Sequence, residues 1–81
     1  MEKLTDRIVI DPKVMHGKSV IMGTRVPVEI VLGSLAGGME IKEVCSEYGL
    51  KKEDVQAAMD YATRLISHEE VIVLSLMLNK Y

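Results

Sequence analysis

The sequence has one cysteine, no tryptophan and no phenylalanine among its 81 residues. A single cysteine excludes a disulfide within the chain and a zinc site made of several cysteines, and it fits a protein of the reducing cytoplasm. Because three tyrosines are the only aromatic residues, the core must be built from Val, Ile, Leu, Met and Ala. We expect one small domain whose core alone is marginally stable.

The sequence also lacks a hydrophobic segment that could span a bilayer. The longest apolar run, Val71–Leu78, is interrupted by Ser75 and is far shorter than the roughly 20 residues that a transmembrane helix needs. At the N-terminus no basic stretch precedes an apolar one, so no secretory signal is expected. These features predict a cytoplasmic protein with no role at a membrane.

The net charge is −2, and the two signs are unevenly distributed along the chain. Residues 1–25 carry five basic and three acidic side chains, whereas residues 26–70 carry four basic and nine acidic ones. Since Lys and Arg provide much of the affinity for nucleic acid, the N-terminal segment would have to supply part of any phosphate contact.

Two β-branched runs near the N-terminus, Arg7–Ile10 and Ser19–Met22, are bounded by turn-forming residues. This pattern predicts an irregular β-hairpin within an N-terminal arm of residues 1–25. Gly23 follows the second run, where a positive φ angle would give the chain a sharp exit. Pro27 then suits the first position of a helix, because its missing N–H would have no partner there.

Three apolar stripes with helical spacing follow the predicted hairpin. They are formed by Val28, Val31, Leu32 and Leu35, by Ile41, Val44, Cys45 and Tyr48, and by Val55, Ala58, Met59, Ala62, Leu65 and Ile66. None of these faces can be buried alone, so residues 26–68 should form a core of three helices. The predicted fold is mainly α, with a helix-turn-helix core of homeodomain-like or winged-helix-like type behind the N-terminal β-hairpin.

The C-terminal tail, residues 69–81, has no clean periodicity and fits a buried strand or a buried helix equally well. A small domain has little interior left to cover such a segment. The tail either folds back over the helices or binds a second copy or a different protein. Its candidate partner-binding residues are Val71, Ile72, Val73, Leu74, Leu76, Met77 and Leu78.

The segment Ile41–Met59 has the pattern of a helix-turn-helix unit, with Gly49 in the turn. In such a unit the start of the second helix faces bases in the major groove of DNA. The candidate DNA-binding residues are Lys51, Lys52 and Gln56 on this helix, with Arg7, Lys18 and Arg25 as phosphate contacts from the arm. Acidic neighbours of the two lysines weaken binding by one copy, so DNA binding would require a dimer.

No set of residues predicts catalysis, a cofactor or a metal site. Cys45 lies on the inner stripe of a helix beside two glutamates, unlike the positive surroundings of a reactive thiolate. No activated nucleophile or oxyanion site accompanies the carboxylates near His16, so we expect neither an enzyme nor a small-molecule substrate. His68, followed by two glutamates, is typical of the charged end of a helix.

Thr24 and Arg25 also have a structural interpretation. The hydroxyl of Thr24 can bond the nearby backbone. The guanidinium of Arg25 can tie the hairpin to an acidic helix such as the one that carries Glu53 and Asp54. We favour this structural role for the pair over contact with phosphate.

Several motifs together resemble the family called domain of unknown function 433. The resemblance spans residues 7–68 and rests on "IDPKVMHGKSVIMGTRVPVEIVL" and "EVCSEYGLKKEDVQAAMDYA". The matching positions are Asp11, Pro12, Gly17, Lys18, Gly23, Thr24, Arg25, Val26, Pro27, Val28, Glu53, Asp54, Val55, Ala58, Tyr61 and Ala62. Ser19 replaces the family's usual proline, which loosens the strand entry, and Met22 replaces a charged residue, which removes one phosphate contact.

The resemblance implies a helix-turn-helix protein with a β-hairpin in front, of the antitoxin-like kind that partners PIN-like ribonuclease toxins. It implies a homodimer that regulates transcription and masks a partner protein. The alternative is a protein-interaction module that has the helix-turn-helix shape but binds no DNA. A positive stripe around Lys51, Lys52 and Gln56 would favour DNA, and an acidic surface there would favour protein.

Overall fold

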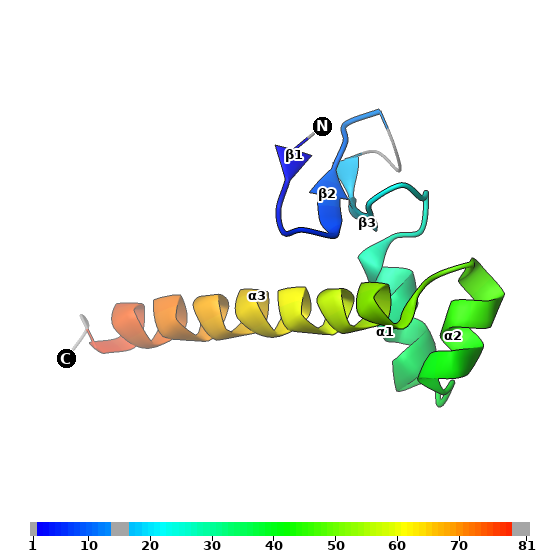
Figure 1. The fold of residues 1–81 in the computed structure, drawn as a ribbon. Coiled ribbons are helices and arrows are strands. Elements are labelled where there is room, and N and C mark those ends of the chain that lie inside the picture. The colour runs from blue at the N-terminus through cyan, green and yellow to red at the C-terminus, as the bar shows by residue number, and fades with distance from the viewer. Residues whose placement is uncertain (1, 14–16, 79–81) are drawn as a thin grey trace.

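The computed structural model describes residues 2–13 and 17–78, and from residue 70 onward it describes one side chain, that of Ile72. The chain folds into a small antiparallel sheet followed by three helices (Figure 1). The elements are β1 (Glu2–Lys3), β2 (Ile8–Ile10), β3 (Ser19–Ile21), α1 (Val28–Ala36), α2 (Ile41–Tyr48) and α3 (Lys52–Leu78). The fold is mainly helical with the sheet in front, as the sequence predicts.

The sheet has the strand order β1-β2-β3, and both pairs are antiparallel. β2 and β3 form the expected hairpin, in which Ile8 pairs with Ile21 and Val9 pairs with Val20. β1 adds a further strand at the outer edge of β2. The sequence does not predict β1, because its two residues show no alternation of apolar and polar side chains.

Side chains from the sheet and from all three helices form one core. Its buried members are Ile8, Ile21, Val28, Val31, Val44, Leu50, Val55 and Ala58. These residues are all aliphatic, as the absence of Trp and Phe requires. Val9 and Val20 are also buried, on the other face of the sheet, since side chains alternate along a strand. The sheet therefore contributes side chains to the core that the helices form.

The helix boundaries follow local signals in the sequence, with one shift. Pro27 is the N-cap of α1 and not its first helical residue, because its ψ angle of 143° is extended. It forms a β-bridge with Val20 instead. α2 begins with a capping box, in which the carboxylates of Glu40 and Glu43 each accept the other residue's backbone N–H. These contacts fix the directions in which α1 and α2 begin.

α3 has 27 residues, which makes it about 40 Å long. Its first turns pack against α1, α2 and β2, whereas its second half extends away from the rest of the molecule (Figure 1). The tail is thus a helix as far as Leu78 and does not fold back over the other helices. The interpretation of His68 as a helix end is wrong, because the glutamates after it do not interrupt the helical backbone.

Candidate interaction surfaces

α2, a turn of three residues and the start of α3 form what we call the α2–α3 unit (Ile41–Asp60). Gly49 ends α2 in the left-handed conformation, with φ of 66° and ψ of 37°, and its N–H donates to the carbonyl of Cys45. Leu50 and Val55, after the turn, are buried in the core. The bend expected at Gly49 is present, and the two buried residues hold α3 against α2.

Lys51, Lys52 and Gln56 are all exposed at the start of α3. Within the part of the chain that the structure describes, neither lysine forms an ion pair. These three side chains are therefore accessible to another macromolecule, which the predicted role of the second helix requires.

Asp54 joins the sheet to the start of α3. Its side chain is only 13% exposed, and one of its oxygens accepts a hydrogen bond from Nη1 of Arg7 at 2.9 Å. The other oxygen accepts the backbone N–H of Lys51 at 2.9 Å, which satisfies a donor that the first helical turn leaves free. The expectation that Arg25 ties the sheet to this helix is wrong, since Arg7 makes the contact.

Sequence reasoning missed this role of Asp54. A carboxylate in the first turn of a helix is a recognisable signal, since it favours the positive end of the helix dipole. Its partner lies 47 residues away along the chain, and no spacing rule points to Arg7. The pair could be found only once the sheet and α3 were placed together.

Thr24 has the structural role that the sequence predicts. Its hydroxyl donates to the carbonyl of Ile21 at 2.8 Å and accepts the N–H of Val26 at 3.0 Å, which holds the turn after β3. Arg25 beside it is exposed. Among the residues described, it takes part in no ion pair.

The six candidate DNA-binding residues thus fall into two groups. Arg7 is held by Asp54, and Lys18 pairs with Glu29 on α1. The other four, Lys51, Lys52, Gln56 and Arg25, are exposed. Because the pair between Lys18 and Glu29 is itself exposed, it contributes little to stability and leaves Lys18 able to change partners.

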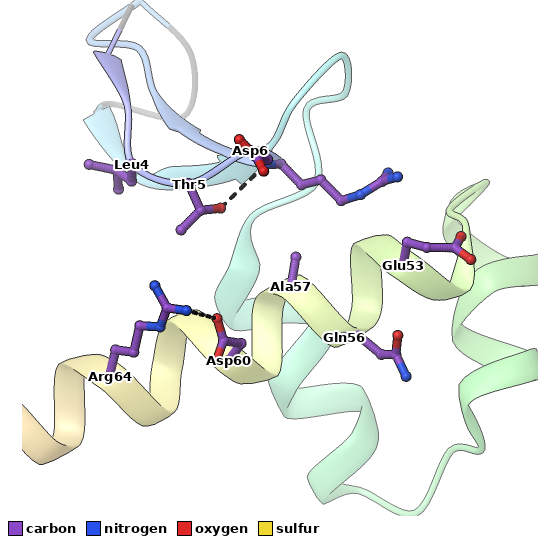
Figure 2. Close-up of a pocket in the computed structure, with 9 residues that line it drawn as sticks. Leu4, Thr5, Asp6, Glu53, Gln56, Ala57, Asp60 and Arg64 are labelled. Carbon is purple, nitrogen blue, oxygen red and sulfur yellow. Dashed lines mark hydrogen bonds and ion pairs between the residues drawn. The ribbon is translucent and has the colours of Figure 1, made fainter.

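An open hollow of about 530 Å³ lies between the loop after β1 and the first turns of α3 (Figure 2). It is lined by Leu4, Thr5, Asp6 and Arg7 from the loop and by Glu53, Gln56, Ala57, Asp60 and Arg64 from α3. Both arginines already pair with carboxylates, Arg7 with Asp54 and Arg64 with Asp60. Gln56 therefore borders a surface that has no positive excess.

The α2–α3 unit and its cap are acidic. From Glu40 to Asp60 the chain carries six carboxylates and three lysines, and of the six only Asp54 is buried. Lys51 and Lys52 do not continue into a positive stripe along α3, because Glu53 and the hollow follow them. An acidic surface of this kind repels phosphate and suits a basic protein.

The second half of α3 carries apolar side chains without cover. Leu65, Ile66 and Ile72 are 45%, 56% and 45% exposed. Of the candidate partner-binding residues, Ile72 is the one whose side chain is described. Val71, Val73, Leu74, Leu76, Met77 and Leu78 have helical backbone, and their side chains lie outside the described part.

Other chemical features are sparse in the described residues. Across residues 2–13 and 17–78 no group of His, Cys, Asp and Glu side chains is placed to hold a metal ion. Cys45 is half-buried and packs against the core. His16 lies outside the described residues. Within the same ranges, no helix combines the length and the apolar character that crossing a membrane requires.

The fold defines a class of small, mainly helical proteins in which a short sheet precedes three helices. The chain belongs to the family described as "Protein of unknown function (DUF433)", which matches residues 8–62. The match confirms the resemblance seen in the sequence. It also ends where α3 leaves the rest of the molecule, so we call residues 8–62 the body.

Three relatives show how far the similarity reaches. The chain is 30% identical over 64 residues to the uncharacterized protein Rv2308 of Mycobacterium tuberculosis. This match covers 79% of this chain and 27% of that protein. The crystal structure of a DUF433 member protein from Anabaena variabilis matches with a TM-score of 0.71 and 30% identity, over 88% of this chain and 71% of that one. The crystal structure of Rv2018 from Mycobacterium tuberculosis matches with a TM-score of 0.60 and 33% identity. This match covers 64% of this chain and 24% of that chain.

This chain therefore spans about a quarter of the length of the two mycobacterial proteins. The similarity carries no information about the remainder of their chains.

Proposed function

We propose that the chain is an antitoxin-like helix-turn-helix protein of the cytoplasm that acts by binding another protein and not by catalysis. The partner class that the family resemblance implies is a PIN-like ribonuclease toxin, whose activity the bound chain would mask. The exposed second half of α3 is the proposed binding surface.

The observation that carries this proposal is the lack of cover on α3 beyond the body. Every described residue from Thr63 to Glu69 is exposed, and so is Ile72. A helix gains most of its stability from packing one face, and an isolated helix of this length is marginal in water. Exposed apolar side chains grouped on one element mark interaction sites. We therefore expect this half of α3 to be covered by protein in the working complex.

The charge of the α2–α3 unit supports a basic partner. A ribonuclease must present Lys or Arg to hold the phosphates of RNA. The carboxylates on α2 and around the hollow are complementary to such groups, which favours fast and selective association. An acidic chain bound over the RNA-binding groups would also compete with RNA directly.

The test is co-purification of the chain with a tagged PIN-like ribonuclease encoded beside it, combined with an assay of RNA cleavage. Removing residues 71–81 should abolish both the complex and the inhibition. A chain that ends after Leu78 is the matched control, since it keeps the whole helix, and it should behave as the full chain. A complex that survives the longer deletion would refute this half of α3 as the binding surface.

Binding of duplex DNA is the second candidate function. It is favoured by the exposure of Lys51, Lys52 and Gln56 at the start of the second helix of the α2–α3 unit. Because the unit is acidic, two copies would have to bind together to gain enough phosphate contacts. Arg25 and Lys18 are the basic residues of the arm available for this purpose.

A gel-shift experiment with the DNA upstream of the chain's own gene tests this candidate. The double variant Lys51→Glu with Lys52→Glu should abolish the shift, and the affinity of the unchanged chain should fall steeply with salt. Lys42→Glu, on the exposed side of α2, is the control of equal charge. If the double variant binds as well as this control, α3 is not a recognition helix.

A further inference from the structure

The apolar side of α3 continues from the core into the exposed half of the helix. Ala58, Leu65 and Ile72 are seven residues apart, and such positions lie on one side of a helix. Ala58 is fully buried against the body, whereas Leu65 and Ile72 are each 45% exposed. A repeat of seven residues is the spacing with which one helix packs along another. The exposed stripe therefore has the form of a helix–helix contact that lacks its second helix.

The middle of this stripe holds two polar residues that restrict the occupant. His68 and Glu69 lie between Leu65 and Ile72, and both are exposed. An apolar helix would leave the carboxylate of Glu69 without a hydrogen-bond donor. A helix that covers the stripe has to present a donor opposite Glu69 and an acceptor or carboxylate opposite His68.

A second copy of α3 meets both requirements when it runs antiparallel. With the two-fold axis between residues 68 and 69, Leu65 of one copy lies opposite Ile72 of the other. In the same register His68 lies opposite Glu69 of the second copy, so an imidazole N–H can donate to a carboxylate. Because the arrangement is symmetric, each of these contacts is made twice.

A parallel pair of helices does not fit the same residues. It would set Glu69 opposite Glu69, and like charges that face each other are destabilising. It would also set His68 opposite His68, so that no carboxylate would face the imidazole. The apolar pair would fit either direction, and the order of His68 and Glu69 selects the antiparallel direction and this register.

We propose that the side of α3 with Leu65 and Ile72 is the dimer contact of this protein, formed by antiparallel pairing with a second copy. The inference rests on the proposed function in that it takes this half of α3 as a binding surface, and it names the occupant of one side. The pairing sets the two bodies at opposite ends of the joined helices and leaves the remaining sides of residues 71–78 for the partner protein.

Sedimentation equilibrium of the purified chain is the first measurement. We expect a mass of twice 9.0 kDa at micromolar concentration. Leu65→Glu and Ile72→Glu should each raise the dissociation constant about a hundredfold, as expected when a charge enters the centre of an interface. Ser67→Glu, which places the same charge on the opposite side of α3, should leave the mass unchanged. A chain that stays a monomer, or a dimer that tolerates both glutamates, would overturn the proposal.

Charge exchange tests the direction of the pair and does not depend on apolar substitutions. His68→Glu sets two carboxylates opposite each other and should weaken the dimer about tenfold or more. The double variant H68E/E69K restores an opposite pair in the antiparallel register, so the dimer should return. In a parallel pair the same double variant faces like with like, and its failure to recover would contradict the proposal. Circular dichroism confirms that each variant keeps its helices.

Disulfide trapping tests the register. On a C45A background, a chain with L65C is mixed with a chain with I72C under an added thiol oxidant. The mixture should yield the mixed disulfide, because bridged Cα atoms must lie within about 7 Å of each other. Each chain alone should give little cross-link. Efficient bridging of L65C to itself would overturn the register.

These outcomes can be separated from those of the proposed function. If the dimer is absent but the ribonuclease still binds, the pairing is wrong and the proposed function stands. If the dimer forms as described but no ribonuclease binds, the pairing stands and the partner class is wrong.

Discussion

The two halves of α3 both carry apolar residues, but their surroundings are opposite. Val55 and Ala58, in the first half, are fully buried, whereas Leu65 and Ile72, in the second, are half exposed. The family match covers the first half and ends at residue 62. The comparison shows that the buried core lies within the part of the chain that the family match covers. The remainder of α3 adds apolar surface that the body does not use.

The largest expected difference in the free energy of unfolding is between truncation of an isoleucine inside the body and truncation of one outside it. Ile21→Ala should lower the free energy of unfolding by about 2–5 kcal/mol, because it leaves a cavity in the core. Ile72→Ala should change it by less than about 0.5 kcal/mol in a dilute, monomeric sample. Urea unfolding followed by circular dichroism measures both. Equal losses would show that the second half of α3 is covered within the single chain.

A medium effect is expected where the sheet meets α3. Asp54→Ala removes the bond to the N–H of Lys51 and the partner of Arg7, and it should cost about 1–3 kcal/mol. Arg7 keeps access to water, which limits the loss. Asp60→Ala is the matched control, since Asp60 forms an exposed pair with Arg64, and it should cost less than about 0.5 kcal/mol. A similar cost for the two would mean that Asp54 does not join the sheet to the helix.

The smallest effects come from two glycines and should differ in sign. Gly49→Ala should destabilise the protein by about 1–2 kcal/mol, since the residue has a φ angle of 66° at the end of α2. Gly33→Ala should stabilise it by about 0.5–1 kcal/mol, because Gly33 lies within α1 and an added Cβ meets nothing within 4 Å. Thermal unfolding of both variants checks the pair, and a stabilising Gly49→Ala would rule out the observed turn.

Much of the fold can be predicted from the sequence because the signals for it are local. The hairpin of β2 and β3, the stripes of the three helices and the turn at Gly49 all depend on residues within a few positions of one another. The family resemblance can be recognised for the same reason, since its motifs are contiguous in the sequence. β1 escaped prediction because its two residues form a strand only by pairing with β2.

The candidate surfaces are harder to predict from the sequence. Lys51 in the turn and Lys52 and Gln56 on α3 are exposed, which agrees with prediction. The pairing of Arg7 with Asp54 and the hollow beside Gln56 depend on how the first loop lies over α3. Periodicity carries no information on that placement, so the sequence favours Arg25 for a contact that Arg7 makes in the structure.

The sequence by itself determined that this protein is small, mainly helical and aliphatic in its core, because composition and spacing act through each residue's near neighbours. Only the tertiary structure decided that the tail continues α3 as a helix and that Leu65, Ile66 and Ile72 lie exposed on that helix. It alone decided which cations are already paired within the chain. Cover and pairing arise between segments far apart in the chain, so their outcome depends on packing and not on pattern.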